Sequence, residues 1–443
     1  MVSIGSSSKN LLATDFDALA LVACSLAGLR RMAFRMRPLG AAPWVVLSLL
    51  FAVHMPVAAK SRNSPAKAAA PQVAEDGLAE TRLMEVYDLM AKGRSREALE
   101  RAGHLVQEYP NFQLAQLVYG DLLAARIRPV NTLGDIPAAQ AQASAGALIE
   151  LRDESRKRVT AGRERPRAGM IPSQFLQISQ KTRYAIAVDA SRSRLYLFEN
   201  RPTGLTLVAD YYTSVGKAGV SKNFQGDQRT PLGVYYITSN LDPKSLKDFY
   251  GSGALPINYP NMLDAKRGKT GGGIWLHGTP SNQFSRPPLA TDGCLVMANP
   301  DLRHLIKTVE VGSTPVVIAP QLQWVDARST KQESQPFDDT LQAWAHAKMD
   351  GNLDRLMSFY ATDFNAYGKT RDQWAGNLKT ELTKVQGHTI ELKDKSFLRW
   401  TDSAETMVVT FGEVVTGKRT GWTKRQYWNR QGGQWKIFFE GTI

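Results

Sequence analysis

The chain has 443 residues, which is enough for two or three domains. Hydrophobic residues make up 43% and charged residues 22%, a composition that excludes a largely disordered protein. The net charge of +14 predicts an anionic partner, which for an exported chain is a cell envelope rather than nucleic acid. The two cysteines, Cys24 and Cys294, are too few for a disulfide-rich scaffold.

Residues 1–59 have the order of a secretory signal peptide: a basic stretch, an apolar run and a small-residue cleavage site. The apolar run, residues 44–53, is shorter than the about 20 residues that a membrane-spanning helix needs. An uncleaved anchor is the alternative, and Met32 and Met36 are alternative starts of translation. We therefore expect an exported protein of the periplasm or cell envelope that touches a membrane only through this segment. Its removal leaves a net charge of +11.

A flexible linker is predicted for residues 60–75 and a helical module for residues 76–165. Apolar residues at three-to-four-residue spacing predict one helix before Gly93, a second that ends near Pro110, and a third after it. A fourth helix is expected at about residues 146–161. Gly93, Ala98 and Pro110 match the turn glycine, small alanine and closing proline of a tetratricopeptide repeat. One and a half repeats cannot form a solenoid, so we expect a helical hairpin that docks a partner, docks a second copy or supports the rest of the chain.

Residues 168–320 have the pattern of a β-rich domain built from short strands. The expected strands are residues 184–189, 194–198, 205–214, 234–238, 273–276 and 314–318, and a short helix is expected at 301–309.

His277 and Cys294 form the candidate catalytic pair of this region, separated by a loop rich in Pro, Ser, Asn and Gln. A thiol is a strong nucleophile only as the thiolate, and a nearby imidazole lowers its pKa and shuttles its proton. Gly293 lets the backbone bend so that amide N–H groups face a developing oxyanion. A buried free cysteine near a core histidine is the alternative, but the surrounding motif favours catalysis.

The motif resembles the signature of the YkuD-type L,D-transpeptidase catalytic domain, in which HGT and a polar loop precede (S/T)-x-G-C. The resemblance extends over roughly residues 183–320 and implies a mostly β, sandwich-like domain with the cysteine loop at one end. The segments that carry it are His277-Gly278-Thr279, Thr291-Asp292-Gly293-Cys294, residues 226–235, residues 257–261 with Asp264, and Thr270-Gly271.

The activity implied by this resemblance is acyl transfer on the stem peptides of peptidoglycan. Cys294 would attack the carbonyl of the diamino acid joined to D-Ala in a tetrapeptide, with His277 as proton shuttle. Backbone N–H groups around Gly293 and Cys294 would bind the oxyanion.

Other motif positions are expected to shape the site or to contact substrate. We expect Gly278, Thr291 and Asp292 to set the loop shape and the orientation of the imidazole. Tyr259 and Thr270 match family motif positions and either line the substrate groove or are structural. No zinc-ligand spacing, P-loop or dinucleotide fingerprint is present, so we expect no metal, no cofactor and no nucleic-acid partner.

The fate of the acyl-enzyme separates two reactions, since an amine acceptor gives cross-linking and water gives a trimmed tripeptide. Transpeptidases of the family usually carry Arg two positions after the nucleophile, where this chain has Val296. The INYPN segment, residues 257–261, together with the C-terminal region resembles L,D-carboxypeptidases that shape helical cells and the branch that detaches lipoprotein from murein. Both cross-linking and hydrolysis therefore stay open. A wall-binding scaffold without catalytic activity is a further alternative, which the intact His277 and Cys294 disfavour.

Residues 334–443 resemble the cone-shaped, α+β NTF2-like fold, with helices first and long strands after them. Such cones often hold an aromatic-lined pocket, although here we expect most of the aromatics to be core. A binding or homodimerisation module is therefore expected. The predicted helices are residues 338–348 and 353–360, and the predicted strands are 389–400, 405–416, 421–429 and 434–440.

Overall fold

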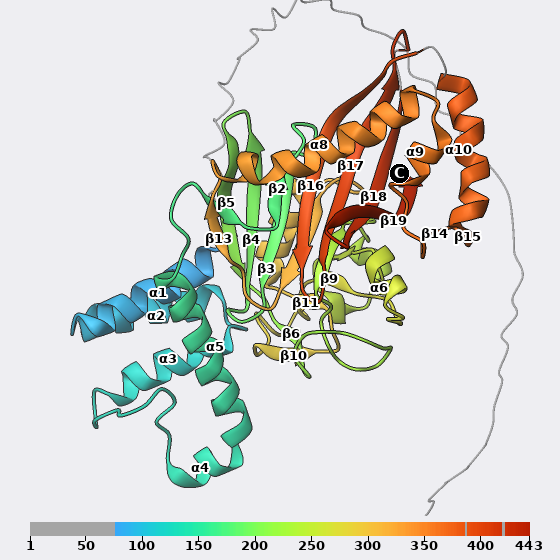
Figure 1. The fold of residues 1–443 in the computed structure, drawn as a ribbon. Coiled ribbons are helices and arrows are strands. Elements are labelled where there is room, and N and C mark those ends of the chain that lie inside the picture. The colour runs from blue at the N-terminus through green and yellow to red at the C-terminus, as the bar shows by residue number, and fades with distance from the viewer. Residues whose placement is uncertain (1–75, 386–387, 419–420) are drawn as a thin grey trace, which may run out of the picture. The chain divides into compact units, whose positions relative to one another are not determined.

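The computed structural model describes residues 76–385, 388–418 and 421–443 (Figure 1). The expected signal segment and the whole of the expected linker lie outside these residues. Within the described ranges, no helix combines the length and the apolar character needed to cross a membrane.

The helical module contains the four predicted helices and one more. The turn between α1 and α2 uses Gly93 at φ 70°, a left-handed conformation that suits glycine. Apolar side chains of the first three helices form one buried cluster, as the helical spacing predicts. The helices are α1 (Leu78–Ala91), α2 (Ser95–Glu108), α3 (Gln113–Ala124), α4 (Ala138–Ala143) and α5 (Ala145–Arg163). The short α4 was not predicted.

The central sheet of the middle region has the order β5-β4-β3-β12-β7. Only β3 and β12 pair in parallel, and the other neighbours are antiparallel. Its members are β3 (Tyr184–Asp189), β4 (Arg194–Arg201), β5 (Gly204–Tyr212), β7 (Gly233–Tyr236) and β12 (Pro315–Ala319), which confirms five predicted strands to within a few residues.

A second, three-stranded sheet of order β11-β9-β8 carries the candidate catalytic residues. One face of the central sheet packs with this small sheet and with α7 (Asn299–Thr308) in a single apolar cluster. The strands are β8 (Ala254–Pro256), β9 (Trp275–His277) and β11 (Leu295–Val296). The smaller elements of this region are β1 (Met170–Pro172) paired with β13 (Trp324–Asp326), β6 (Val215–Gly216) paired with β10 (Leu289–Thr291), η1 (Pro243–Ser245), η2 (Asp248–Tyr250) and α6 (Met262–Lys266).

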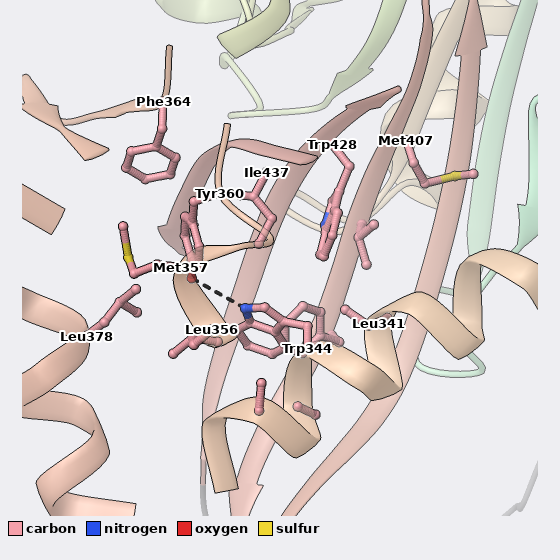
Figure 2. Close-up of a cluster of buried hydrophobic side chains, with 14 of the residues drawn as sticks. Leu341, Trp344, Leu356, Met357, Tyr360, Phe364, Leu378, Met407, Trp428 and Ile437 are labelled. Atoms are coloured by element: carbon pink, nitrogen blue, oxygen red, sulfur yellow. Dashed lines mark hydrogen bonds between the residues drawn. The ribbon is translucent and has the colours of Figure 1, made fainter. Parts of the chain in front are cut away.

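The C-terminal region is a sheet of order β19-β18-β17-β16-β2 with helices over one face (Figure 1). Figure 2 shows the buried cluster between them, where Trp344 Nε1 donates a hydrogen bond to Tyr360 Oη at 3.4 Å. The elements are α8 (Thr330–Met349), α9 (Leu353–Met357), β14 (Asn365–Ala366), β15 (Lys369–Thr370), α10 (Arg371–Val385), β16 (Ile390–Thr401), β17 (Glu405–Val415), β18 (Trp422–Gln431) and β19 (Gln434–Thr442).

Two features of this region were not predicted. The helix α10 is absent from the expected elements, and the fifth strand, β2 (Phe175–Gln177), comes from the sequence just before the central sheet. Because β2 pairs with β16, the C-terminal sheet lies against the second face of the central sheet, and one apolar cluster joins the two. The two sheets therefore stack face to face, with the helices of the C-terminal region on one outer side and the small sheet and α7 on the other.

Most aromatics of the C-terminal region are core, as expected. The aromatics that could have lined a pocket are Tyr360, Tyr367, Trp374, Trp400, Trp422, Tyr427, Trp428 and Trp435. Five of them are buried: Tyr360, Trp374, Trp400, Tyr427 and Trp428. A cavity of about 660 Å³ does open between α10 and the strands, but only Trp422 among these aromatics lines it. Its wall is otherwise rich in charged side chains such as Glu381, Glu413 and Lys424.

Candidate active site

His277 ends β9 and is only 1% exposed. Its Nδ1 lies 2.7 Å from the carbonyl oxygen of Gly278. A carbonyl only accepts hydrogen bonds, so Nδ1 carries the proton and Nε2 is left as the basic atom. The rings of Phe249 and Tyr250 lie with their centroids 5.8 Å and 5.1 Å from the imidazole and form its apolar wall.

This environment keeps the imidazole neutral. Burial lowers the pKa of His277 to about 4, and the positive charge of Arg286 acts in the same direction, while the bond to Gly278 opposes both. At neutral pH the side chain is therefore a proton acceptor rather than an imidazolium.

Cys294 immediately precedes β11, which pairs in parallel with β9 so that Val296 aligns with His277. The thiol Sγ lies 3.5 Å from the carbonyl oxygen of Gly273 and donates to it. Burial raises the pKa of Cys294, while the Trp275 N–H and the Arg286 charge counteract this rise. The expectation of a thiol with a lowered pKa is therefore wrong for the resting site, which pairs a neutral thiol with a neutral imidazole.

The turn before the thiol is held by Thr291. Its hydroxyl donates to the carbonyl oxygen of Cys294 at 2.7 Å and accepts from the N–H of Gly293 at 3.1 Å. Gly293 has φ 120°, and an added Cβ would lie 2.6 Å from the carbonyl oxygen of Arg229. The Gly293 amide is thus engaged, whereas the described residues offer no acceptor to the Cys294 amide. Of the two expected oxyanion donors, the Cys294 N–H is the one left free.

Gly278 is required by close packing. An added Cβ would lie 2.1 Å from Oδ1 of Asn299, the first residue of α7. The Asn299 amide accepts from the N–H of Ser252 and donates to the carbonyl oxygen of Thr279, both at 2.8 Å. Asn299 was not predicted from the sequence, and it ties the histidine strand to α7 and to the loop that supplies Phe249.

The remaining predicted residues lie further out. Asp292 is exposed and pairs with Lys217 Nζ at 3.2 Å rather than with the imidazole. Tyr259 is 6% exposed, and its hydroxyl donates to the carbonyl oxygen of Thr270 at 3.2 Å, so these two lie together. Burial raises the pKa of Tyr259 to about 12.

The sequence comparisons assign two domains to this architecture. The family model of the L,D-transpeptidase catalytic domain, YkuD, matches residues 183–318, which hold both His277 and Cys294. The Cds6 C-terminal NTF2-like domain matches residues 337–441. The chain carries an L,D-transpeptidase catalytic domain followed by an NTF2-like domain.

Several solved structures are similar to this chain, and Bd1075 shares its fold. Bd1075 from Bdellovibrio bacteriovorus is 24% identical with a TM-score of 0.53, and the match covers 62% of this chain and 98% of that one. The helical cell shape determining protein Pgp2 from Campylobacter jejuni is 20% identical with a TM-score of 0.48, and the match covers 61% and 96%. A comparison with curated protein sequences gave no match.

Arg286 is a site residue that sequence reasoning missed. It belongs to the loop between the two candidate catalytic residues of the L,D-transpeptidase domain, and it is 9% exposed. Its guanidinium lies 4.3 Å from the centre of the Phe249 ring. The sequence Ser285-Arg286-Pro287-Pro288 was the available signal, but no pattern in it indicates which way the arginine points.

The helical module holds the part of this loop that carries Arg286. Ser285 Oγ donates to Glu154 Oε1 of α5 at 2.7 Å. Phe284 stacks on Phe112 with centroids 4.3 Å apart, and its N–H donates to the carbonyl oxygen of Asn111 at 3.1 Å. Of the roles expected for the module, the contacts therefore favour support, and its target is the active-site loop of the L,D-transpeptidase domain.

Proposed function

We propose that the protein is an exported, peptidoglycan-modifying enzyme that acts on the bond between the diamino acid and D-Ala of the stem tetrapeptide. Cys294 is its nucleophile and His277 its general base. The observation that carries this proposal is the neutral imidazole, whose Nδ1 is bound to Gly278 and whose Nε2 is basic, on the strand beside the thiol. The match of residues 183–318 to the L,D-transpeptidase catalytic domain supports the substrate class.

In the first half-reaction, Nε2 of His277 takes the thiol proton as Sγ of Cys294 attacks the diamino acid carbonyl carbon. The new C–S bond leaves a tetrahedral oxyanion, and the Cys294 amide is available to donate to it. The oxyanion then collapses, the C–N bond to D-Ala breaks, and the imidazolium returns its proton to the departing amine. The product is a thioester on Cys294.

The acceptor of this thioester defines the reaction. Attack by an amine gives a cross-link, while attack by water gives a tripeptide, and release of a wall-linked lipoprotein is hydrolysis of the same kind. Hydrolysis is supported by Val296, which is 1% exposed beside His277, in the place where transpeptidases of the resembled family carry arginine. A guanidinium at that position would have to be buried in the sheet.

The test uses residues 60–443 with disaccharide-tetrapeptide, alone and with a second muropeptide as acceptor, and identifies products by mass spectrometry. Tripeptide and free D-Ala in both samples indicate an L,D-carboxypeptidase. Cross-linked dimers in the second sample indicate a transpeptidase. If neither product forms, or if Cys294→Ala retains activity, the proposal fails.

The same proposal assigns roles to the remaining site residues. Gly278, Gly293 and Thr291 fix the backbone around the reacting groups. Tyr259 and Thr270 form a wall of the substrate groove.

The proposed domain limits are residues 76–165, 168–320 and 334–443. A homodimer through the NTF2-like domain stays a prediction.

A further inference from the structure

We propose that Arg286 binds the terminal carboxylate of the stem peptide and thereby selects substrates that end in a free D-Ala. This inference rests on the proposed function, because it concerns the same substrate and the same site.

Arg286 is a buried cation without an ion pair among the described residues, although the charge of Asp292 acts on it from further away. It is 9% exposed, and no carboxylate lies within ion-pair distance of it in the described part of the chain. Among the described residues the guanidinium makes one polar contact, a weak 3.5 Å approach of Nη2 to the carbonyl oxygen of Phe249. Burial of an unpaired charge is costly, so a site that retains one is suited to an anionic ligand.

Two other cations near the thiol are already neutralised. Lys217 pairs with Asp292 at 3.2 Å, and Lys222 pairs with Asp227 at 2.7 Å. Arg286 alone among these three keeps its charge available.

The position of Arg286 relative to the reacting groups fits this ligand. The guanidinium stacks on Phe249, whose ring contacts the imidazole of His277, and its charge acts on both His277 and Cys294. In the substrate, only the amide nitrogen and one Cα separate the attacked carbonyl from the D-Ala carboxylate. A cation close to both catalytic groups is therefore within reach of that carboxylate.

Geometry and support also favour this role. A guanidinium donates two parallel hydrogen bonds to a carboxylate, which fixes orientation as well as charge. The loop is held on both sides of the side chain, since Ser285 donates to Glu154 and the Tyr212 hydroxyl donates to the Arg286 carbonyl oxygen at 2.8 Å. The backbone that carries Arg286 is therefore fixed.

The test compares disaccharide-tetrapeptide with the same compound ending in D-alaninamide, which lacks the charge. We expect the wild-type protein to prefer the acid in kcat/KM by roughly ten- to a hundredfold, the value of a charge-assisted hydrogen bond. Arg286→Gln should lose this preference, and Arg286→Lys should keep part of it. The matched control is Lys244→Gln, which removes an exposed cation of η1 in the same domain and should leave the acid-to-amide ratio unchanged.

A second measurement does not depend on turnover. Affinities for the acid and the amide are measured by calorimetry with Cys294→Ala and with the double variant Cys294→Ala/Arg286→Gln. Preference for the acid in the first and none in the second supports the inference. If Arg286→Gln weakens the binding of both compounds equally, Arg286 only packs against Phe249 and the inference is wrong. The proposed function is judged separately, because it stays intact as long as the wild-type protein releases D-Ala.

Discussion

Ser285, on the loop between the two candidate catalytic residues, donates a hydrogen bond to Glu154 of α5 at 2.7 Å. Glu154 is itself buried and holds Arg158, whose guanidinium lies 3.9 Å from the ring centre of Tyr212. The helical module thus reaches the active site through a chain of direct contacts.

Loss of this contact should reduce activity more than stability. Ser285→Ala removes one hydrogen bond to a charged group, a contribution of about 1.5–3 kcal/mol to the placement of the loop. We expect kcat/KM to fall several-fold while the melting temperature changes by only a few degrees. Ser281→Ala alters an exposed side chain of the same loop and should behave as wild type. Wild-type kinetics for Ser285→Ala would mean that the module does not position the loop.

The pH dependence should follow His277. In the proposed mechanism the neutral imidazole is the base, and burial lowers its pKa to about 4. The acidic limb of kcat/KM should therefore be absent between about pH 7 and pH 5 and appear as the pH falls through about 4, provided that the fold persists. Far-UV circular dichroism at each pH checks this condition. An acidic limb centred near the usual histidine value of about 6.5 would contradict a neutral, buried base.

Thr291 should act through the turn rather than through substrate. Thr291→Val keeps the shape but loses both the donation to Cys294 and the acceptance from Gly293. We expect kcat to fall at least tenfold with little change in KM, because the thiol and its amide lose their fixed placement. Thr291→Ser retains the hydroxyl and should restore most of the activity. An equal loss in Thr291→Ser would show that the hydroxyl alone does not restore the turn, and it would contradict this role.

Gly293→Ala should be among the most damaging small substitutions. The residue would have to adopt φ 120°, and its Cβ would lie 2.6 Å from the Arg229 carbonyl oxygen. We expect loss of acyl-enzyme formation and a lower melting temperature. Gly376→Ala, at an open position inside α10, is the control and should stabilise the protein slightly. Normal turnover in Gly293→Ala would show that the tight turn is dispensable.

The sequence predicted most strands of the L,D-transpeptidase domain and its candidate pair, because short apolar runs and a local motif carry that information. The helix α10 was missed although Trp374, Leu378 and Leu382 recur every four residues, since Gly376 and two threonines weaken its helical propensity. Nothing local indicates that β2, three residues long, pairs with β16 more than 200 positions later.

The same limit applies to the site. The direction of Arg286 and the engagement of the Gly293 amide depend on contacts between distant segments, and so does the raised pKa of Cys294, which follows from burial. Spacing along the chain identifies which residues can react, while burial and tertiary contacts decide their protonation.

Intact-protein mass spectrometry tests the central claim most directly. The protein is mixed with disaccharide-tetrapeptide, quenched in acid at short times and weighed. The account predicts a mass increase equal to the disaccharide-tripeptide minus water, located at Cys294, with one free D-Ala per adduct, and no adduct in Cys294→Ala. Release of D-Ala without any adduct on Cys294, or at the wild-type rate by Cys294→Ala, would contradict it.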